Sequence, residues 1–146
     1  MSNLASLADV YESLKTLGYD AVLKDQSVAV KVGGLEKPFP AVITYNESRQ
    51  HFQINCMLAV LGDVAEENVT NFAVAALDAN TRIAPFAYGL ISEADDPGAD
   101  EVEKWPIVLT HSIPVGDFSQ GELDSAMKSL VAALMDSQTL LDVFQA

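Results

Sequence analysis

Cysteine, basic residues and long apolar runs are all scarce in this chain of 146 residues. The single cysteine, Cys56, excludes a disulfide within the chain and is typical of a protein in a reducing compartment. No run reaches the roughly 18 consecutive apolar residues of a membrane span, and the N-terminus lacks the basic and apolar regions of a signal peptide. The sequence therefore predicts a cytoplasmic protein without stable membrane insertion.

Basic residues are outnumbered, because 8 Lys and Arg residues stand against 21 Asp and Glu residues, for a formal net charge of −13. Such a charge repels phosphate backbones, so we expect no nucleic acid partner. The simplest role of the acidity is to keep a chain with 49% hydrophobic residues soluble. A basic or amphipathic protein segment is the kind of partner that remains compatible with it.

The central part of the chain predicts a helix followed by a strand. Asp63 and Glu66 resemble a capping box, so we expect the helix to begin there. Pro85 excludes its continuation, and residues 86–91 then have the pattern of a buried strand. The apolar, mostly small side of this helix consists of Val69, Phe72, Ala73, Ala76, Leu77 and Asn80.

Two further helices are expected at the ends of the chain. Ser2 or Asn3 can cap the first helix, and Gly18 can end it. Ser119 and Glu122 form an S-x-x-E capping box before a terminal helix of about 25 residues, roughly 38 Å long. Its apolar stripe consists of Leu123, Met127, Leu130, Leu134, Leu141 and Phe144. Because this helix is long for a small domain, we expect part of the stripe to face a partner.

Alternating apolar residues predict strands at 19–24, 27–32, 41–45, 51–61, 86–91 and 105–113. In the longest, an apolar face alternates with a more polar one, which is typical of an antiparallel sheet with helices on one side. Pro38 and Pro40 place Phe39 in a loop or at a sheet edge. The sequence predicts one α+β domain over residues 1–146, in the order α-β-β-β(-β)-α-β-β-α. Its antiparallel sheet would have about five to six strands, with helices mainly on one face.

Catalytic and metal-binding patterns are lacking. His51 and His111 lie in predicted strands, without an adjacent Ser, Cys or carboxylate in a catalytic arrangement. Cys56 lies on an apolar strand face, where a thiol provides no thiolate. The acidic stretch 93–104 lacks the spacing of a calcium loop, so we expect a solvated turn. We expect no enzymatic activity, no cofactor and no metal site, and the alternative is a small-molecule or divalent-metal-binding sensor or regulator.

The order of elements resembles the type III secretion chaperone-like fold, which YbjN-type bacterial proteins share. More narrowly, the sequence is similar to the YjfI-like family of bacterial proteins, in segments 48–50, 71–72, 80–85 and 89–91. The resemblance implies non-enzymatic, often dimeric proteins that bind an extended or amphipathic protein segment. It also implies a membrane-stress protein similar to phage-shock protein A as a partner. Arg82 would be the basic residue that family members carry near the end of the central helix.

We therefore expect a chaperone-like, protein-binding homodimer that captures an apolar segment on its sheet face or at an exposed strand edge. The candidate contact residues are Phe39, Phe52, Met57, Arg82, Phe86, Trp105, Leu134, Leu141 and Phe144. For each apolar candidate, packing in the core is the competing role. For Arg82 the competing role is an ion pair within this acid-rich chain.

Overall fold

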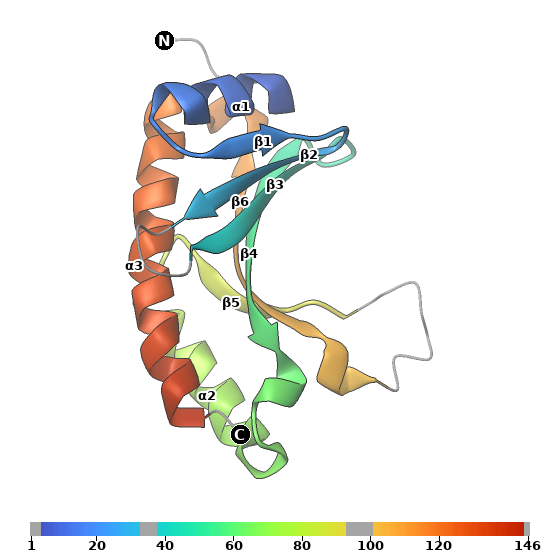
Figure 1. The fold of residues 1–146 in the computed structure, drawn as a ribbon, viewed down its shortest axis with the longest axis vertical. Helices are drawn as coiled ribbons and strands as arrows, with labels where there is room; N and C mark the ends of the chain where they lie inside the picture. Colours follow the sequence, from blue (N-terminus) through green and yellow to red (C-terminus); the bar gives the residue numbers. More distant parts are fainter. Residues whose placement is uncertain (1–3, 33–37, 93–100, 145–146) are drawn as a thin grey trace.

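The computed structural model describes residues 4–32, 38–92 and 101–144 (Figure 1). The helices are α1 (Leu7–Thr16), α2 (Val69–Ala79) and α3 (Gln120–Phe144). The strands are β1 (Ala21–Leu23), β2 (Ser27–Val32), β3 (Phe39–Asn46), β4 (His51–Val60), β5 (Ala87–Leu90) and β6 (Pro106–Pro114). Short 3-10 turns occupy Leu61–Asp63, Glu66–Asn68, Val102–Lys104 and Val115–Asp117. The α+β class and the order of elements are as the sequence predicted.

The six strands form one antiparallel sheet in the order β1-β2-β3-β4-β6-β5. The register pairs Val28 with Ile43 and Ile43 with Ile54, so this row of side chains points to one face. All three helices lie on that side, with α3 running along the sheet, α1 near one end and α2 near the other (Figure 1). Strand β6 lies between β4 and β5, so the short strand β5 forms one edge of the sheet.

The core has a large part and a small part, and α3 contributes to both. The large cluster packs α1 and α3 on the sheet, with Leu14, Phe52 and Phe118 fully buried. The small cluster consists of Val64, Phe72, Ile107 and Leu141, with Phe144 packed against it. The length of α3 follows from this arrangement, because a helix must span both clusters to bury its apolar stripe. These stripe residues face the core of their own chain: Leu123, Met127, Leu130, Leu134 and Leu141.

Two predicted helix starts are wrong, for local reasons. Asp63 does not cap α2: its Oδ2 accepts a hydrogen bond from the Val60 N–H at 3.0 Å, and α2 begins only at Val69, after a further 3-10 turn. Helix α1 is capped by Ser6, whose Oγ accepts from the Asp9 N–H at 3.2 Å. The predicted caps Ser2 and Asn3 lie outside the described residues.

Two other helix boundaries are confirmed. Gly18 follows α1 with a φ of +92°, a conformation that favours glycine. Ser119 caps α3, since the Glu122 N–H donates to Ser119 Oγ at 3.1 Å. Each boundary depends on a single residue: a glycine that adopts the positive φ after α1, and a hydroxyl that accepts a backbone N–H at the start of α3. The local sequence is therefore sufficient to set both boundaries.

The placement of Phe39 in a loop or at an edge is also wrong, because β3 begins at Phe39 and lies between β2 and β4. Phe39 pairs with Val32 and Pro40 with Lys31, at the end of the β2–β3 ladder. A proline is tolerated near a strand end because few ladder hydrogen bonds depend on its missing N–H. Of the predicted acidic turn, residues 93–100 lie outside the described residues, and Val102–Lys104 form a 3-10 turn.

Candidate protein-binding surface

Negative charge is kept off the sheet. In the part of the chain that the structure describes, none of the six strands contains an Asp or Glu, and the one Lys or Arg in those strands is Lys31. Its Nζ lies 3.8 Å from Asp20 Oδ2 on the exposed surface. In a chain of net charge −13, a sheet without carboxylates is a surface that an uncharged partner can approach without losing strong ionic hydration.

The sheet face without a helix is polar but uncharged at its centre. Gln53 Nε2 donates to Asn55 Oδ1 at 3.4 Å and to Thr110 Oγ1 at 3.3 Å across β4 and β6. Beside this group the side chains of Met57 and Val42 are 47% and 37% exposed. The centre of this face is therefore linked by hydrogen bonds among its own side chains, with two exposed apolar side chains beside it.

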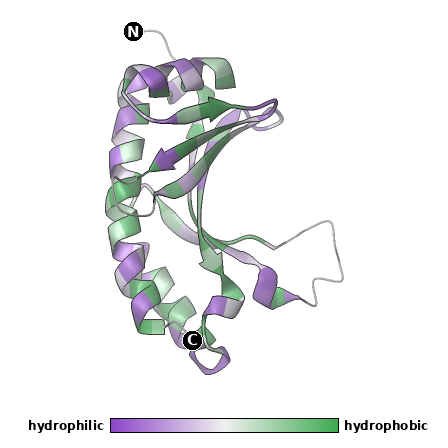
Figure 2. Cartoon of the chain, in the orientation of Figure 1, coloured by the Kyte–Doolittle hydropathy of each residue, from purple (hydrophilic) through white to green (hydrophobic). Residues whose placement is uncertain are grey.

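The more pronounced apolar feature is a groove of about 280 Å³ between α2 and β5. Phe72, Ala76 and Ile107, all nearly buried, form its base. Leu77 of α2 and Leu90 of β5 form its rim and remain 69% and 45% exposed. In Figure 2, the end of β4 that leads toward α2 is green, the colour of hydrophobic residues. The groove therefore presents apolar side chains to solvent at the edge of the sheet.

The groove contains the face that the sequence assigned to the central helix. All six residues of that face line it: Val69, Phe72, Ala73, Ala76, Leu77 and Asn80. The helical pattern was right about which residues share a side of α2. It did not indicate that this side is only partly covered, because the cover depends on how far β5 extends along the helix.

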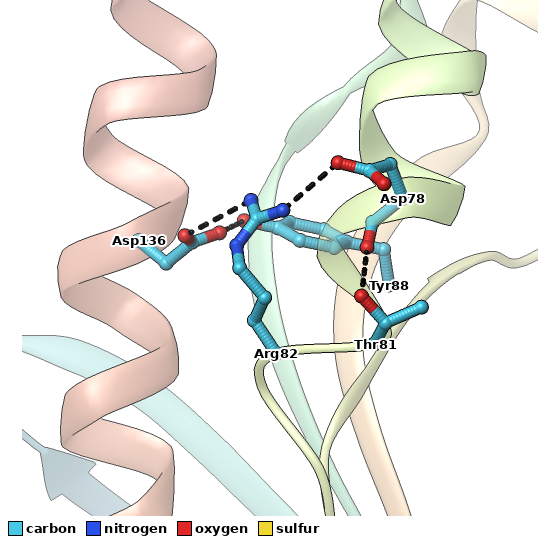
Figure 3. Close-up of polar contacts among 5 residues, drawn as sticks. All are labelled: Asp78, Thr81, Arg82, Tyr88 and Asp136. Carbon is cyan, nitrogen blue, oxygen red and sulfur yellow. Dashed lines mark hydrogen bonds and ion pairs between the residues drawn. The ribbon is translucent and has the colours of Figure 1, made fainter.

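A polar cluster fixes the connection from α2 to β5 (Figure 3). Asn80 Oδ1 accepts from the Tyr88 N–H at 2.7 Å, and Tyr88 Oη donates to Asp136 Oδ2 of α3 at 2.9 Å. Arg82 lies between two carboxylates, with Nη1 2.9 Å from Asp78 Oδ2 and Nη2 3.6 Å from Asp136 Oδ1. These contacts hold one wall of the groove against α3. Arg82 thus forms ion pairs within its own chain, which was the alternative to a contact with a partner.

Burial and the Asp136 carboxylate raise the pKa of Tyr88 well above its ordinary value of 10.0. The hydrogen bond to Asp78 is the main cause that raises the pKa of the exposed Arg82 guanidinium, and the charges of Asp136 and Asp78 raise it further. Both groups therefore keep their protons over the physiological pH range. Tyr88 remains a hydrogen-bond donor to Asp136, and the cluster is a permanent structural connection at neutral pH.

The eight apolar residues among the predicted contacts fall into two groups. Phe52, Phe86, Leu134 and Leu141 are 0%, 1%, 5% and 6% exposed and belong to the core. Phe39, Trp105 and Phe144 are partly buried, whereas Met57 is exposed on the open sheet face. None of the nine candidate residues lines the groove.

The rim leucines of the groove were not among the predicted contacts. A signal was available in the sequence, because the stretch 69–77 carries no charge in a chain in which 20% of residues are charged. Apart from Asp78 the solvent side of α2 is also uncharged, which indicates a surface that a partner can cover. Several of the large apolar candidates are instead buried in the core, namely Phe52, Phe86, Leu134 and Leu141.

The side chains of Cys56 and His111, which could be reactive elsewhere, pack against other side chains of this fold. Burial raises the pKa of the Cys56 thiol to about 12. His111 packs against the Phe86 ring with centroids 5.2 Å apart, and burial lowers its pKa. In the described ranges, no group of three or more His, Cys, Asp or Glu residues could hold a metal ion. No helix in those ranges is long and apolar enough to cross a membrane.

Several solved structures share this fold. YbjN from E. coli, described as a putative transcription regulator, is 15% identical with a TM-score of 0.62, over 97% of this chain and 93% of that one. A chain of the HopA1–SchA chaperone–effector complex is 15% identical with a TM-score of 0.56, over 86% and 87%. A chain of the ExsC–ExsE complex is 12% identical with a TM-score of 0.58, over 94% and 97%.

The protein therefore has the YbjN-like, type III secretion chaperone-like fold that the sequence predicted. At these identities the likeness establishes the fold alone. No family model matches the sequence, and no curated protein matches it. The narrower similarity to the YjfI-like family stays a prediction from short sequence segments.

Proposed function

We propose that this protein is a non-enzymatic, cytoplasmic, chaperone-like module that holds an apolar segment of a partner protein in the groove between α2 and β5. The observation that carries the proposal is the exposed apolar rim, Leu77 and Leu90, above a base of buried apolar side chains. Two structural neighbours were solved in complexes, one of them a chaperone–effector complex, which supports a protein partner for this fold.

The size of the rim is sufficient for a modest affinity. Burying a leucine side chain completely stabilises by roughly 1.5–3 kcal/mol. Leu77 is 69% and Leu90 45% exposed, so covering both would contribute about 2–3 kcal/mol before the costs of association. A useful complex therefore needs further contacts beyond the two leucines, and the partner must extend past the groove.

The test is capture of a partner from the native cell by the tagged protein, with two matched variants. Leu77→Asp places a charge on the groove rim, whereas Met135→Asp changes an α3 side chain that is 66% exposed and does not line the groove. We expect the Leu77→Asp variant alone to lose the partner, measured by mass spectrometry against the unmodified protein. Equal capture by all three proteins contradicts the proposed site, and no capture by any contradicts the proposed function.

The proposal includes a homodimer that uses other surfaces. Large apolar side chains outside the groove are also exposed, at Val22 and Leu23 on β1 and at Met135 and Val143 on α3. Such side chains could bury one another in a symmetric contact while the groove stays accessible. Light scattering over a range of concentrations tests this, and a mass that stays monomeric up to about 100 µM contradicts it.

The family resemblance makes the partner more specific: a membrane-stress protein similar to phage-shock protein A. Purification with that protein from a strain that carries both tests this point separately. The alternative function, a small-molecule sensor, is favoured by the volume and apolar lining of the groove, about 280 Å³ against roughly 300 Å³ for small ligand pockets. Binding to the folded state would raise the melting temperature, so apolar ligands and divalent ions should be screened by thermal shift.

A further inference from the structure

The groove lies beside a sheet edge, so a partner could engage it in two ways. An extended segment could pair its main chain with β5, or a helix could insert side chains between α2 and β5. Strand pairing needs the outward N–H and C=O groups of β5 to be free. The two modes therefore differ in what they demand of the β5 backbone, and the hydrogen bonds of that strand discriminate between them.

The edge of β5 is already closed at its centre. The Ile91 N–H donates inward to the Pro106 carbonyl at 3.0 Å, so the alternation of a strand points the N–H groups of Leu90 and Tyr88 outward. The Tyr88 N–H is held by Asn80 Oδ1 at 2.7 Å. An incoming strand would have to displace this short hydrogen bond. The side chain of Asn80, the residue that follows α2, thus protects the edge and leaves the apolar groove open.

The charges next to the groove indicate which kind of helix fits. The groove continues into a second hollow, which shares Leu61 and Val69 with it and is lined by Glu66 and Glu103. No Lys or Arg lines either one. The basic residues that lie nearest along the chain are already paired: Lys104 Nζ lies 2.9 Å from Glu101 Oε2, and Arg82 is held by Asp78 and Asp136. A second copy of this chain would bring its own carboxylates to these, whereas Lys or Arg would be attracted.

We infer that the occupant is an amphipathic helix of another protein, with apolar side chains in the groove and a Lys or Arg at one end facing Glu66 and Glu103. This inference rests on the proposed function and adds the secondary structure and charge of the partner. Helix α2 has 11 residues and is about 16 Å long. A partner helix of about three turns would match it.

The test uses a designed amphipathic peptide of about 14 residues with three Leu on one face. One version carries two Lys after the apolar face and the other carries two Glu, and both are labelled for fluorescence anisotropy. We expect the Lys peptide to bind at least about 10-fold more tightly at 50 mM salt, with the difference falling as salt rises. Equal affinities, tighter binding of the Glu peptide, or no binding of either overturns the inference.

Variants locate the peptide and separate the modes. Leu77→Asp should abolish binding, and Glu66→Gln with Glu103→Gln should remove most of the Lys preference, whereas Glu47→Gln in the β3–β4 turn should not change it. Asn80→Ala frees the Tyr88 N–H, so a marked gain in affinity would show strand pairing and contradict the helix. Circular dichroism of each variant confirms that it is folded.

Failure of this inference is distinguishable from failure of the proposed function. If capture of the native partner depends on Leu77 but the peptides show no preference for Lys, the groove is a binding site with a different occupant. If Leu77→Asp instead converts a dimer to a monomer in light scattering, the occupant is a second copy of this chain. If capture also ignores Leu77, the proposed function fails with it.

Discussion

Removing the Tyr88 hydroxyl should destabilise the protein measurably. Tyr88 Oη donates to Asp136 Oδ2 at 2.9 Å, and the Asp136 side chain is only 28% exposed. Tyr88→Phe removes the hydrogen-bond donor. The Asp136 carboxylate then keeps only its ion pair with Arg82 Nη2, at 3.6 Å, among the contacts of this cluster. The ring itself can stay where it is, so the change tests one hydrogen bond rather than packing.

The magnitude follows from the charge and the partial exposure of Asp136. Hydrogen bonds to charged groups contribute roughly 1.5–3 kcal/mol when buried. Because Asp136 is 28% exposed, water can replace part of the loss, and we expect about 1–2 kcal/mol in the free energy of unfolding. For a domain of this size that corresponds to a fall of roughly 3–8 °C in melting temperature.

The pH dependence gives an independent check. The pKa of Tyr88 is raised above its ordinary value of 10.0, so the folded state retains the proton longer than the unfolded state does. The resulting stability is fully present below about pH 10 and is lost as the pH rises toward the folded-state value. The difference in unfolding free energy between wild type and Tyr88→Phe should therefore be constant from pH 7 to 9 and shrink above pH 10.

The assay is urea unfolding followed by circular dichroism, with Tyr45→Phe as the control. Tyr45 is a half-buried aromatic on β3 that packs on Phe52, and its hydroxyl has no hydrogen bond to another described residue. We expect its loss to change stability by under about 0.5 kcal/mol. If the two variants are equally stable, or if the Tyr88 difference persists unchanged above pH 10, the hydrogen bond to Asp136 does not have the role described.

Three further predictions follow from buried or crowded groups. Cys56, buried and with a pKa of about 12, should react with a thiol reagent only at the rate of unfolding, and fast labelling of the native protein would contradict this. Gly62→Ala should destabilise by about 1–2 kcal/mol, because its Cβ would lie 3.0 Å from the Glu103 carbonyl oxygen. The Cβ of Gly116→Ala would point into open space, so this control should have little effect in the same urea titration. The pKa of His111 is lowered from 6.5 by burial, so stability should be full above pH 6.5 and fall as the pH falls toward the folded-state value. A His111→Gln variant should lack this pH dependence, and an unchanged profile would contradict the prediction.

Most elements could be predicted because their signals are local. The alternation at 27–32 gave the bounds of β2, and Ser119 marked the start of α3. The errors occur where a residue of the expected type has a non-local or competing partner. Asp63 accepts a hydrogen bond from the Val60 N–H instead of capping α2. Pro40 fits into β3 because the other residues of this strand pair with β2 and β4.

The candidate site could be predicted only in part, because burial depends on what covers a face. The pattern on α2 identified the residues that share a side, but the same pattern would result from a fully covered helix. Here β5 has only four residues and ends at Leu90, so Leu77 on the opposite wall lacks a neighbour to cover it. The strand order that places β5 at the edge comes from the pairing of β4 with β6, which no local pattern contains.

The polar contacts around the groove explain why an exposed apolar edge does not lead to uncontrolled association. A free strand edge with apolar side chains is a template for pairing with other chains. At β5 the central donor is occupied by Asn80, and the formal net charge of −13 makes copies of the chain repel one another. The rim leucines remain available to side chains, whereas the backbone is not available to strands. Asn80 therefore restricts what the groove can bind, and Asn80→Ala should increase aggregation on storage, measured by light scattering, before it affects the helical content.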